Sequence, residues 1–203
     1  MKKLFLILAL AILSVIGINA QTVVKIGDQT WAGGNLNVTT FRNGDPLIEA
    51  KTEKEWKRAL KEKKAAWCYY NNDEANEKKH GKLYNEFAIT DPRGLAPAGF
   101  HIPSNEEWVK LGENLGGLKE AGSKLKSSTD FDGDNSSGFN GMASGIRYAN
   151  GPNGFGGAYD NLGVIGYYWS ARRDVFFLKI KKKSINKIPS SGGCYLSVRC
   201  IAD

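Results

Sequence analysis

The side chains most suited to chemistry gather in a glycine-rich stretch between residues 145 and 173. Aromatic rings can stack on the apolar faces of sugars. Asn, Asp and Arg side chains can hydrogen-bond hydroxyls, and Arg can also pair with acidic groups. We therefore predict a binding surface for a glycan or an extended peptide. Its candidate residues are Arg147, Tyr148, Asn153, Phe155, Tyr159, Asp160, Asn161 and Arg172. The alternative is that Tyr148 and Trp169 belong to the core and the glycines serve only turns.

Three alternating aspartates are the nearest approach to a metal site. Asp130, Asp132 and Asp134 could offer hard oxygen ligands to calcium. An EF-hand loop that starts at Asp130 would need Gly at its sixth position and Glu at its twelfth, where this chain has Asn135 and Gly141. We therefore expect a solvated acidic loop and no cofactor, with calcium at the three aspartates as the alternative.

The three cysteines leave the disulfide pattern open. Cys194 and Cys200 are six positions apart in a stretch that is predicted to be strand. Their Cα atoms would then lie about 20 Å apart, which is too far for a bridge. If a disulfide forms, Cys68 should pair with Cys200 or Cys194, and one thiol is left over.

The chain offers no convincing catalytic constellation. It contains no GxSxG elbow, no phosphate-binding glycine loop and no Ser-His-Asp order that stands out. His80 and His101 are isolated, and we interpret them as surface or satisfied histidines. The acidic residues fall mostly on predicted helices or in loops, whereas glycoside hydrolysis needs two carboxylates in a cleft. We predict that the protein is not an enzyme.

The first 20 residues are predicted to be a cleavable signal peptide. Lys2 and Lys3 precede an apolar run at 4–18, and Ala20 offers a small residue at the cut. The run of about 15 residues is shorter than the roughly 20 that a membrane-spanning helix needs, although an uncleaved anchor is the alternative. No cysteine lies near the cut, so we expect a soluble exported product that is not a lipoprotein. It would be periplasmic, on the cell surface or extracellular.

The charge is modestly basic. Without Lys2 and Lys3, 26 basic residues face 21 acidic ones, a net charge of +5. The basic residues are spread out, which suits acidic glycans or anionic surfaces better than nucleic acid. No segment after the signal is long and apolar enough to span a bilayer. We therefore expect neither a nucleic-acid partner nor stable membrane insertion.

Local signals predict two helices among several short strands. Capping boxes at 52–55 and 104–107 should open helices that run to about 64 and to about 115. Alternation around Gly27-Asp28 predicts a hairpin at 23–38, and further strands are expected at 65–70, 167–170, 176–180 and 195–201. Nine glycines between 138 and 166 rule out regular helix there and predict long loops. No linker or repeat divides residues 21–203, so we predict one domain.

Eight strings in order carry a family resemblance. They are VKIGDQTWAGGNL at 24–36, WCYYNND at 67–73, GKLYNEFAI at 81–89, GLAPAGFHIPSNEEWVKL at 94–111, AGSKLKS at 121–127, SGFNGMASGIRY at 137–148, GYYWSAR at 166–172 and YLSVRCIAD at 195–203. The chain resembles the Fibrobacter succinogenes major paralogous domain, a family of secreted and surface proteins of the Bacteroidetes and Fibrobacter groups. Family members usually have a Cys where Ala96 stands, which implies that Cys200 has lost its customary partner.

The resemblance implies an α+β, C-type-lectin-like domain with two short helices, short antiparallel strands and a long glycine-rich loop region. It implies no general activity. The leading hypothesis is a secreted, non-enzymatic binding module for a polysaccharide or glycan. The alternative is a cell-surface module for protein–protein interaction or assembly. A third hypothesis is an oxidase-like enzyme, because GFHIPSNEEW also resembles a stretch of formylglycine-generating enzymes, which use a pair of cysteines.

Overall fold

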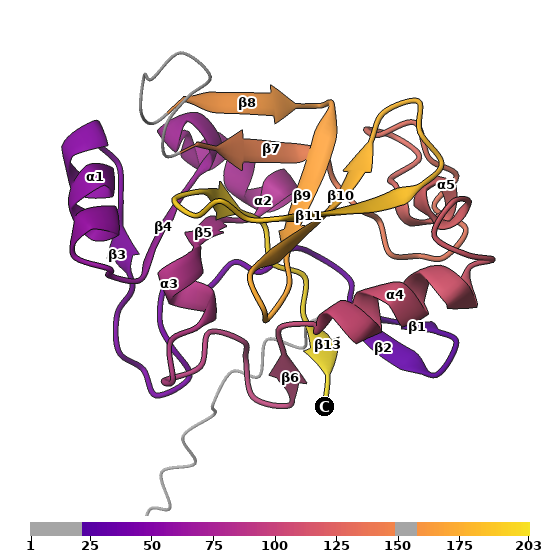
Figure 1. Ribbon diagram of the computed structural model, residues 1–203, viewed down its shortest axis with the longest axis horizontal. Helices are drawn as coiled ribbons and strands as arrows, with labels where there is room; N and C mark the ends of the chain where they lie inside the picture. Colours follow the sequence, from indigo (N-terminus) through magenta and orange to yellow (C-terminus); the bar gives the residue numbers. More distant parts are fainter. Residues whose placement is uncertain (1–21, 149–157) are drawn as a thin grey trace, which may run out of the picture.

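The computed structural model describes residues 22–148 and 158–203. They form one α+β domain with two sheets, which confirms the predicted fold class. Figure 1 shows the larger sheet across the centre of the molecule, with α1 at one side, α5 at the other, and α4 below beside the smaller sheet. The predicted signal peptide at 1–20 lies outside the described residues.

The smaller sheet brings the two ends of the domain together. Its strand order is β1-β2-β13-β6, with all neighbours antiparallel. The predicted hairpin forms, with Ile26 paired to Gln29 across the two-residue loop Gly27-Asp28, but it ends at Ala32 and not at residue 38. Gly27 takes φ +63° there, as the first loop residue of a tight hairpin requires. The strands are β1 (Val23–Ile26), β2 (Gln29–Ala32), β6 (Phe100–His101) and β13 (Ile201–Ala202).

The larger sheet carries the strands that lead to the candidate site. Its order is β11-β10-β9-β7-β12-β5-β4-β3, and β8 pairs with β7 outside that path. β9, β10 and β11 follow one another as an antiparallel meander. The strands are β3 (Ile48–Glu49), β4 (Ala66–Cys68), β5 (Leu83–Asn85), β7 (Ser144–Arg147), β8 (Tyr159–Leu162), β9 (Ile165–Trp169), β10 (Asp174–Lys179), β11 (Ile185–Pro189) and β12 (Tyr195–Leu196).

Both predicted helices form behind their capping boxes. α1 (Glu53–Lys61) begins after Thr52 and buries Trp56 and Ala59. α4 (Asn105–Asn114) begins after Ser104, whose hydroxyl accepts the Glu107 N–H at 3.1 Å while the Glu107 carboxylate accepts the Ser104 N–H at 2.7 Å.

Three more α-helices were not predicted, because segments of four or five residues carry no helical periodicity. They are α2 (Glu77–His80), α3 (Glu86–Ile89) and α5 (Ala121–Leu125), and two 3-10 turns, η1 (Tyr70–Asn72) and η2 (Glu74–Asn76), precede α2.

Three buried clusters hold the sheets and helices together. In the first, Trp108 of α4 stacks on Phe176 and tilts against Trp31, with ring centroids 5.3 and 5.1 Å apart. In the second, the buried Trp169 donates its indole N–H to the Tyr84 carbonyl at 2.7 Å. The third lies under α1. The interpretation of Trp169 as a core residue is therefore confirmed.

The pairing expected for Cys68, if a disulfide forms, is not seen with Cys200, since both thiols are free. Cys68 is buried in the cluster under α1, whereas Cys200 is buried in the cluster around Trp169. Burial raises the pKa of both thiols, and brings that of Cys200 to about 12. Since the two side chains belong to separate clusters, neither is placed to bridge to the other.

None of the helices within 22–148 and 158–203 has the length and apolar character needed to cross a bilayer.

Candidate functional site

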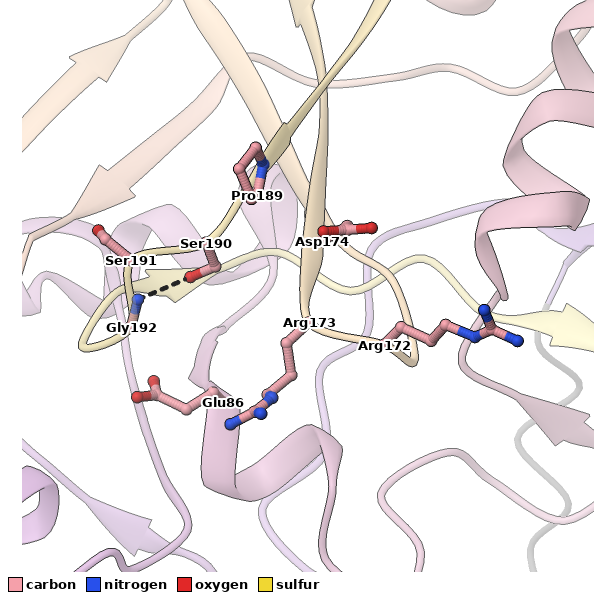
Figure 2. A pocket seen from close by; sticks show the side chains of 8 residues that line it. All are labelled: Glu86, Arg172, Arg173, Asp174, Pro189, Ser190, Ser191 and Gly192. Carbon is pink, nitrogen blue, oxygen red and sulfur yellow. Dashed lines mark hydrogen bonds between the residues drawn. The ribbon is translucent and has the colours of Figure 1, made fainter.

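A polar hollow of about 250 Å³ opens beside the turn between β9 and β10. Figure 2 shows that three separate segments meet there: the start of α3, the β9–β10 turn and the loop that follows β11. We call this hollow the arginine pocket. It is lined by Glu86, Arg172, Arg173, Asp174, Pro189, Ser190, Ser191 and Gly192.

The turn between β9 and β10 places two arginines at the rim. The Ser170 N–H donates to the Asp174 carbonyl, and the Arg173 N–H donates back to the Ser170 carbonyl, each at 2.9 Å. This tight closure holds Arg173 at φ +66°, in the left-handed region that Gly or Asn usually occupies. The chain therefore bears a backbone cost to keep an arginine at this position.

Glu86 closes the floor of the pocket. It is the first residue of α3 and only 7% exposed. Its Oε1 atom accepts the Gly193 N–H at 2.8 Å, while its Oε2 atom is buried and has no hydrogen-bond partner among the described residues. A buried carboxylate oxygen without a donor costs free energy, so a donor supplied by a ligand would stabilise it.

The loop after β11 forms the wall opposite the arginines. The Ser190 hydroxyl accepts the Gly192 N–H at 3.0 Å, which shapes the loop into a tight turn. Gly192 takes φ +83°, and a Cβ atom there would come within 3.4 Å of Glu86 Oε1. A glycine therefore lets the loop lie close over the carboxylate.

The other charged side chains of the arginine pocket differ in how far they are already paired with neighbouring residues. Asp174 accepts from Asn105 Nδ2 at 2.6 Å, and Lys187 Nζ lies 3.5 Å from its carboxylate. Arg172 lies 3.7 Å from Glu106, and both side chains are largely exposed. The guanidinium of Arg173 has no ion pair or hydrogen bond within the described ranges, and Figure 2 shows it extended toward Glu86.

Arg147, a predicted ligand contact, is used inside the fold instead. It is 2% exposed, and its Nη1 atom donates to the Ala50 carbonyl at 2.7 Å. The guanidinium lies 5.1 to 5.7 Å from the ring centres of Trp56, Tyr159 and Tyr195. This aromatic cage stabilises a buried cation through the ring faces.

The other predicted residues of the glycine-rich stretch lie on and beside β8. Tyr159 is half-buried and donates to Asn72 Oδ1 at 2.7 Å, and burial raises its pKa. Asn161 donates to the Tyr167 hydroxyl at 3.2 Å, and the exposed Asp160 accepts the Asn161 N–H. Tyr148 packs partly buried against the core around Trp169. Asn153 and Phe155 lie outside the described residues.

Arg172 does not join this group. It follows the C-terminal end of β9, whereas Asn161 precedes the N-terminal end of the same strand. The predicted site is therefore divided between the two ends of β9. The glycines near β8 also serve the fold: Gly145 takes φ +66°, and a Cβ atom there would lie 2.5 Å from the Asp160 carbonyl oxygen.

The three aspartates proposed for calcium do not converge. Asp130 pairs with Lys79 at 2.5 Å, Asp132 pairs with the buried Lys126 at 2.5 Å, and Asp134 accepts the Ser136 N–H at 2.8 Å. No metal-binding group of three or more His, Cys, Asp or Glu residues occurs in the part of the chain that the structure describes. Each carboxylate takes a different local partner, so the alternating spacing does not bring the three together.

Of the two histidines, His101 links the C-terminus to α4. Its Nδ1 atom lies 2.9 Å from Asp203 and its Nε2 atom 2.8 Å from Glu107. Partial burial lowers its pKa, but the hydrogen bonds to the two carboxylates outweigh burial and raise the pKa above the ordinary value. This bridge ties the residue after β13 to the edge strand β6 and to α4.

Sequence reasoning missed most of the arginine pocket. Glu86, Arg173 and the loop at 189–192 lie far apart in the chain and meet only through the sheet. A local signal did exist, because two arginines occupy a hairpin turn where Gly or Asn is common.

The fold and the pocket define an α+β domain with a small, charged surface site. Comparison with known families agrees with the predicted resemblance: the model of the Fibrobacter succinogenes major domain matches residues 24–202, and the chain belongs to that family. No curated protein and no solved structure matches it significantly.

Proposed function

We propose that this protein is an exported, non-enzymatic binding module and that the arginine pocket holds part of a glycan. The observation that carries the proposal is the buried Glu86 Oε2 atom, which has no donor among the described residues, in a side chain that lines an open hollow. A sugar hydroxyl is a donor of the right kind.

The lining of the pocket suits a hydroxylated ligand. Glu86 accepts hydrogen bonds, Arg172 and Arg173 donate them, and the hydroxyls of Ser190 and Ser191 can do either. A hollow of about 250 Å³ is near the lower limit of ligand pockets, which fits one sugar unit or the end of a chain. The pocket offers little aromatic surface, so we expect recognition through hydrogen bonds rather than stacking.

The proposal includes a C-type-lectin-like fold and export. An antiparallel smaller sheet, a larger sheet that is mostly antiparallel, and the helices α1 and α4 support the fold. The positive residues and apolar run at 2–18 support export. N-terminal sequencing of the protein from an exporting host tests the export, with a new terminus at Gln21 expected and an intact Met1 contradicting it.

The binding is tested by titrating purified protein with a panel of oligosaccharides. Glu86→Gln replaces the carboxylate by an amide, which has one acceptor oxygen in place of two and so cannot accept at both Oε1 and Oε2. A hydrogen bond to a charged group contributes about 1.5–3 kcal/mol, so affinity should fall about 10- to 150-fold. Glu113→Gln on the exposed face of α4 is the matched control and should leave affinity unchanged. An equal effect of both substitutions would contradict the site.

A protein partner is the second candidate, and the edge of the larger sheet favours it. β11 ends the strand order of this sheet, and its Ile188 is 45% exposed. An open edge can accept a strand from another chain. If no sugar binds and Ile188→Lys abolishes capture of a surface protein, this function replaces the glycan proposal.

A further inference from the structure

If the proposed function holds, the charged side chains of the arginine pocket indicate more about the ligand than that it carries hydroxyl groups. Among the described residues, the two acidic groups each have donors, since Glu86 accepts from Gly193 and Asp174 from Asn105. The arginines are less engaged: Arg173 has no partner there, and Arg172 has only a long, exposed contact to Glu106. Two arginines and two acids line the pocket, so its formal charge balances, and Arg173 remains available to an anionic group of a ligand.

The backbone of Arg173 gives an independent reason to assign it a role. A non-glycine residue in the left-handed region costs roughly 1–2 kcal/mol relative to its ordinary conformation. Such conformations cluster at binding sites, although Lys63 and Lys181 also take a positive φ in this chain. In this turn a glycine would close the same hydrogen bonds without the cost, so Arg173→Gly isolates what the guanidinium contributes.

We infer that the ligand is a carboxylated sugar, whose carboxylate pairs with Arg173 and whose hydroxyl donates to Glu86 Oε2. A guanidinium binds a planar carboxylate through two parallel hydrogen bonds. The Glu86 carboxylate repels a second carboxylate, so it selects the hydroxyl side of the sugar and fixes the orientation. A simple anion without a hydroxyl donor would leave Oε2 unsatisfied.

The test compares an acidic oligosaccharide with its methyl ester, which keeps the hydroxyls and removes the charge. One probe ends in glucuronic acid and a second in sialic acid, so that the two sources of a carboxylated sugar are distinguished. Against wild-type protein, we expect one of the acids to bind at least about 10-fold more tightly than its ester, and the difference to shrink with added salt.

The matched variants separate charge from shape. Arg173→Gly keeps the turn and should weaken the acid about 10-fold or more while changing the ester by less than about 3-fold. Glu86→Gln should weaken acid and ester alike. Equal affinity of acid and ester in wild-type protein would overturn the carboxylated-sugar inference and leave the glycan proposal standing. Binding of no acidic, esterified or neutral sugar would overturn both.

Discussion

Gly193 donates its backbone N–H to Glu86 Oε1 at 2.8 Å, across 107 positions of the chain. This contact ties the loop after β11 to the start of α3, while the second carboxylate oxygen, Oε2, is buried without a donor among the described residues. The arginine pocket exists because these segments are locked together, so its chemistry and the stability of its parts can be tested separately.

Arg173→Gly should stabilise the free protein. Glycine relieves the left-handed strain of roughly 1–2 kcal/mol, and part of that gain is lost to the larger entropy of glycine in the unfolded chain. We expect a net gain of about 0.5–1 kcal/mol in the free energy of unfolding, measured by urea denaturation. Arg172→Gly, in the same turn without a positive φ, is the control and should not stabilise. A loss of stability in Arg173→Gly would show that the guanidinium supports the fold.

Arg147→Ala should destabilise the protein by about 3 kcal/mol or more. The substitution removes a buried cation from three aromatic rings, leaves a cavity and frees the Ala50 carbonyl from its donor. Arg172→Ala, at an exposed position, should stay within about 0.5 kcal/mol of wild type. If Arg147→Ala and Arg172→Ala lower the free energy of unfolding by the same small amount, Arg147 is not the structural cation described above.

Gly145→Ala should cost about 2–5 kcal/mol, because the new methyl group meets the Asp160 carbonyl and the Tyr70 ring in addition to the strain of φ +66°. Gly99 also has a positive φ, but a Cβ atom there meets nothing within 4 Å. Gly99→Ala should therefore cost only the strain, roughly 1–2 kcal/mol. The difference in melting temperature between Gly145→Ala and Gly99→Ala measures the effect of the close approach of β7 and β8. Equal decreases in melting temperature would contradict that close approach.

His101 should make stability depend on pH near neutrality. Because its folded pKa is raised, its contribution is fully present below the unfolded pKa of about 6.5 and is lost as pH rises through the folded value. His80 acts in the opposite direction, since burial lowers its pKa and stability is lost as pH falls below about 6.5. The difference in melting temperature between wild type and His101→Asn should therefore shrink between about pH 6 and pH 8. A difference that grows over this range would contradict the bridge to Glu107 and Asp203.

Cys68 and Cys200 should be recovered as thiols without reductant. Both are buried in separate clusters, and burial raises the pKa of each. Alkylation after unfolding, read by mass spectrometry, should label both residues. Native protein should react slowly at either position, because the thiolate is the reactive form. Detection of a peptide pair that is linked through Cys68 would contradict the packing described.

Elements governed by neighbouring residues could be predicted from the sequence. The Ser104–Glu107 capping box spans three positions, and the stripe that includes Trp108 and Leu111 faces the core as its spacing indicates. The Gly27-Asp28 hairpin is equally local. In each case the interaction that forms the element lies within a few residues, so the pattern contains it.

The candidate site could be predicted only in part. Arg172 was identified by its residue type, but Glu86 could not be, because its burial and its bond to Gly193 depend on how β5 and β12 meet in the sheet. Arg147 shows the opposite error. Its type suggested a ligand contact, while the aromatic rings that bury it come from α1, β8 and β12. Local sequence carries no information on such long-range packing.

The most direct test of the arginine pocket is hydrogen–deuterium exchange with and without a bound oligosaccharide. We predict slower exchange in peptides that cover residues 170–174 and 189–193, with peptides from 144–147 and 159–162 unchanged. Protection confined to β7 and β8, with none at the β9–β10 turn, would contradict the account and return the binding site to the glycine-rich stretch.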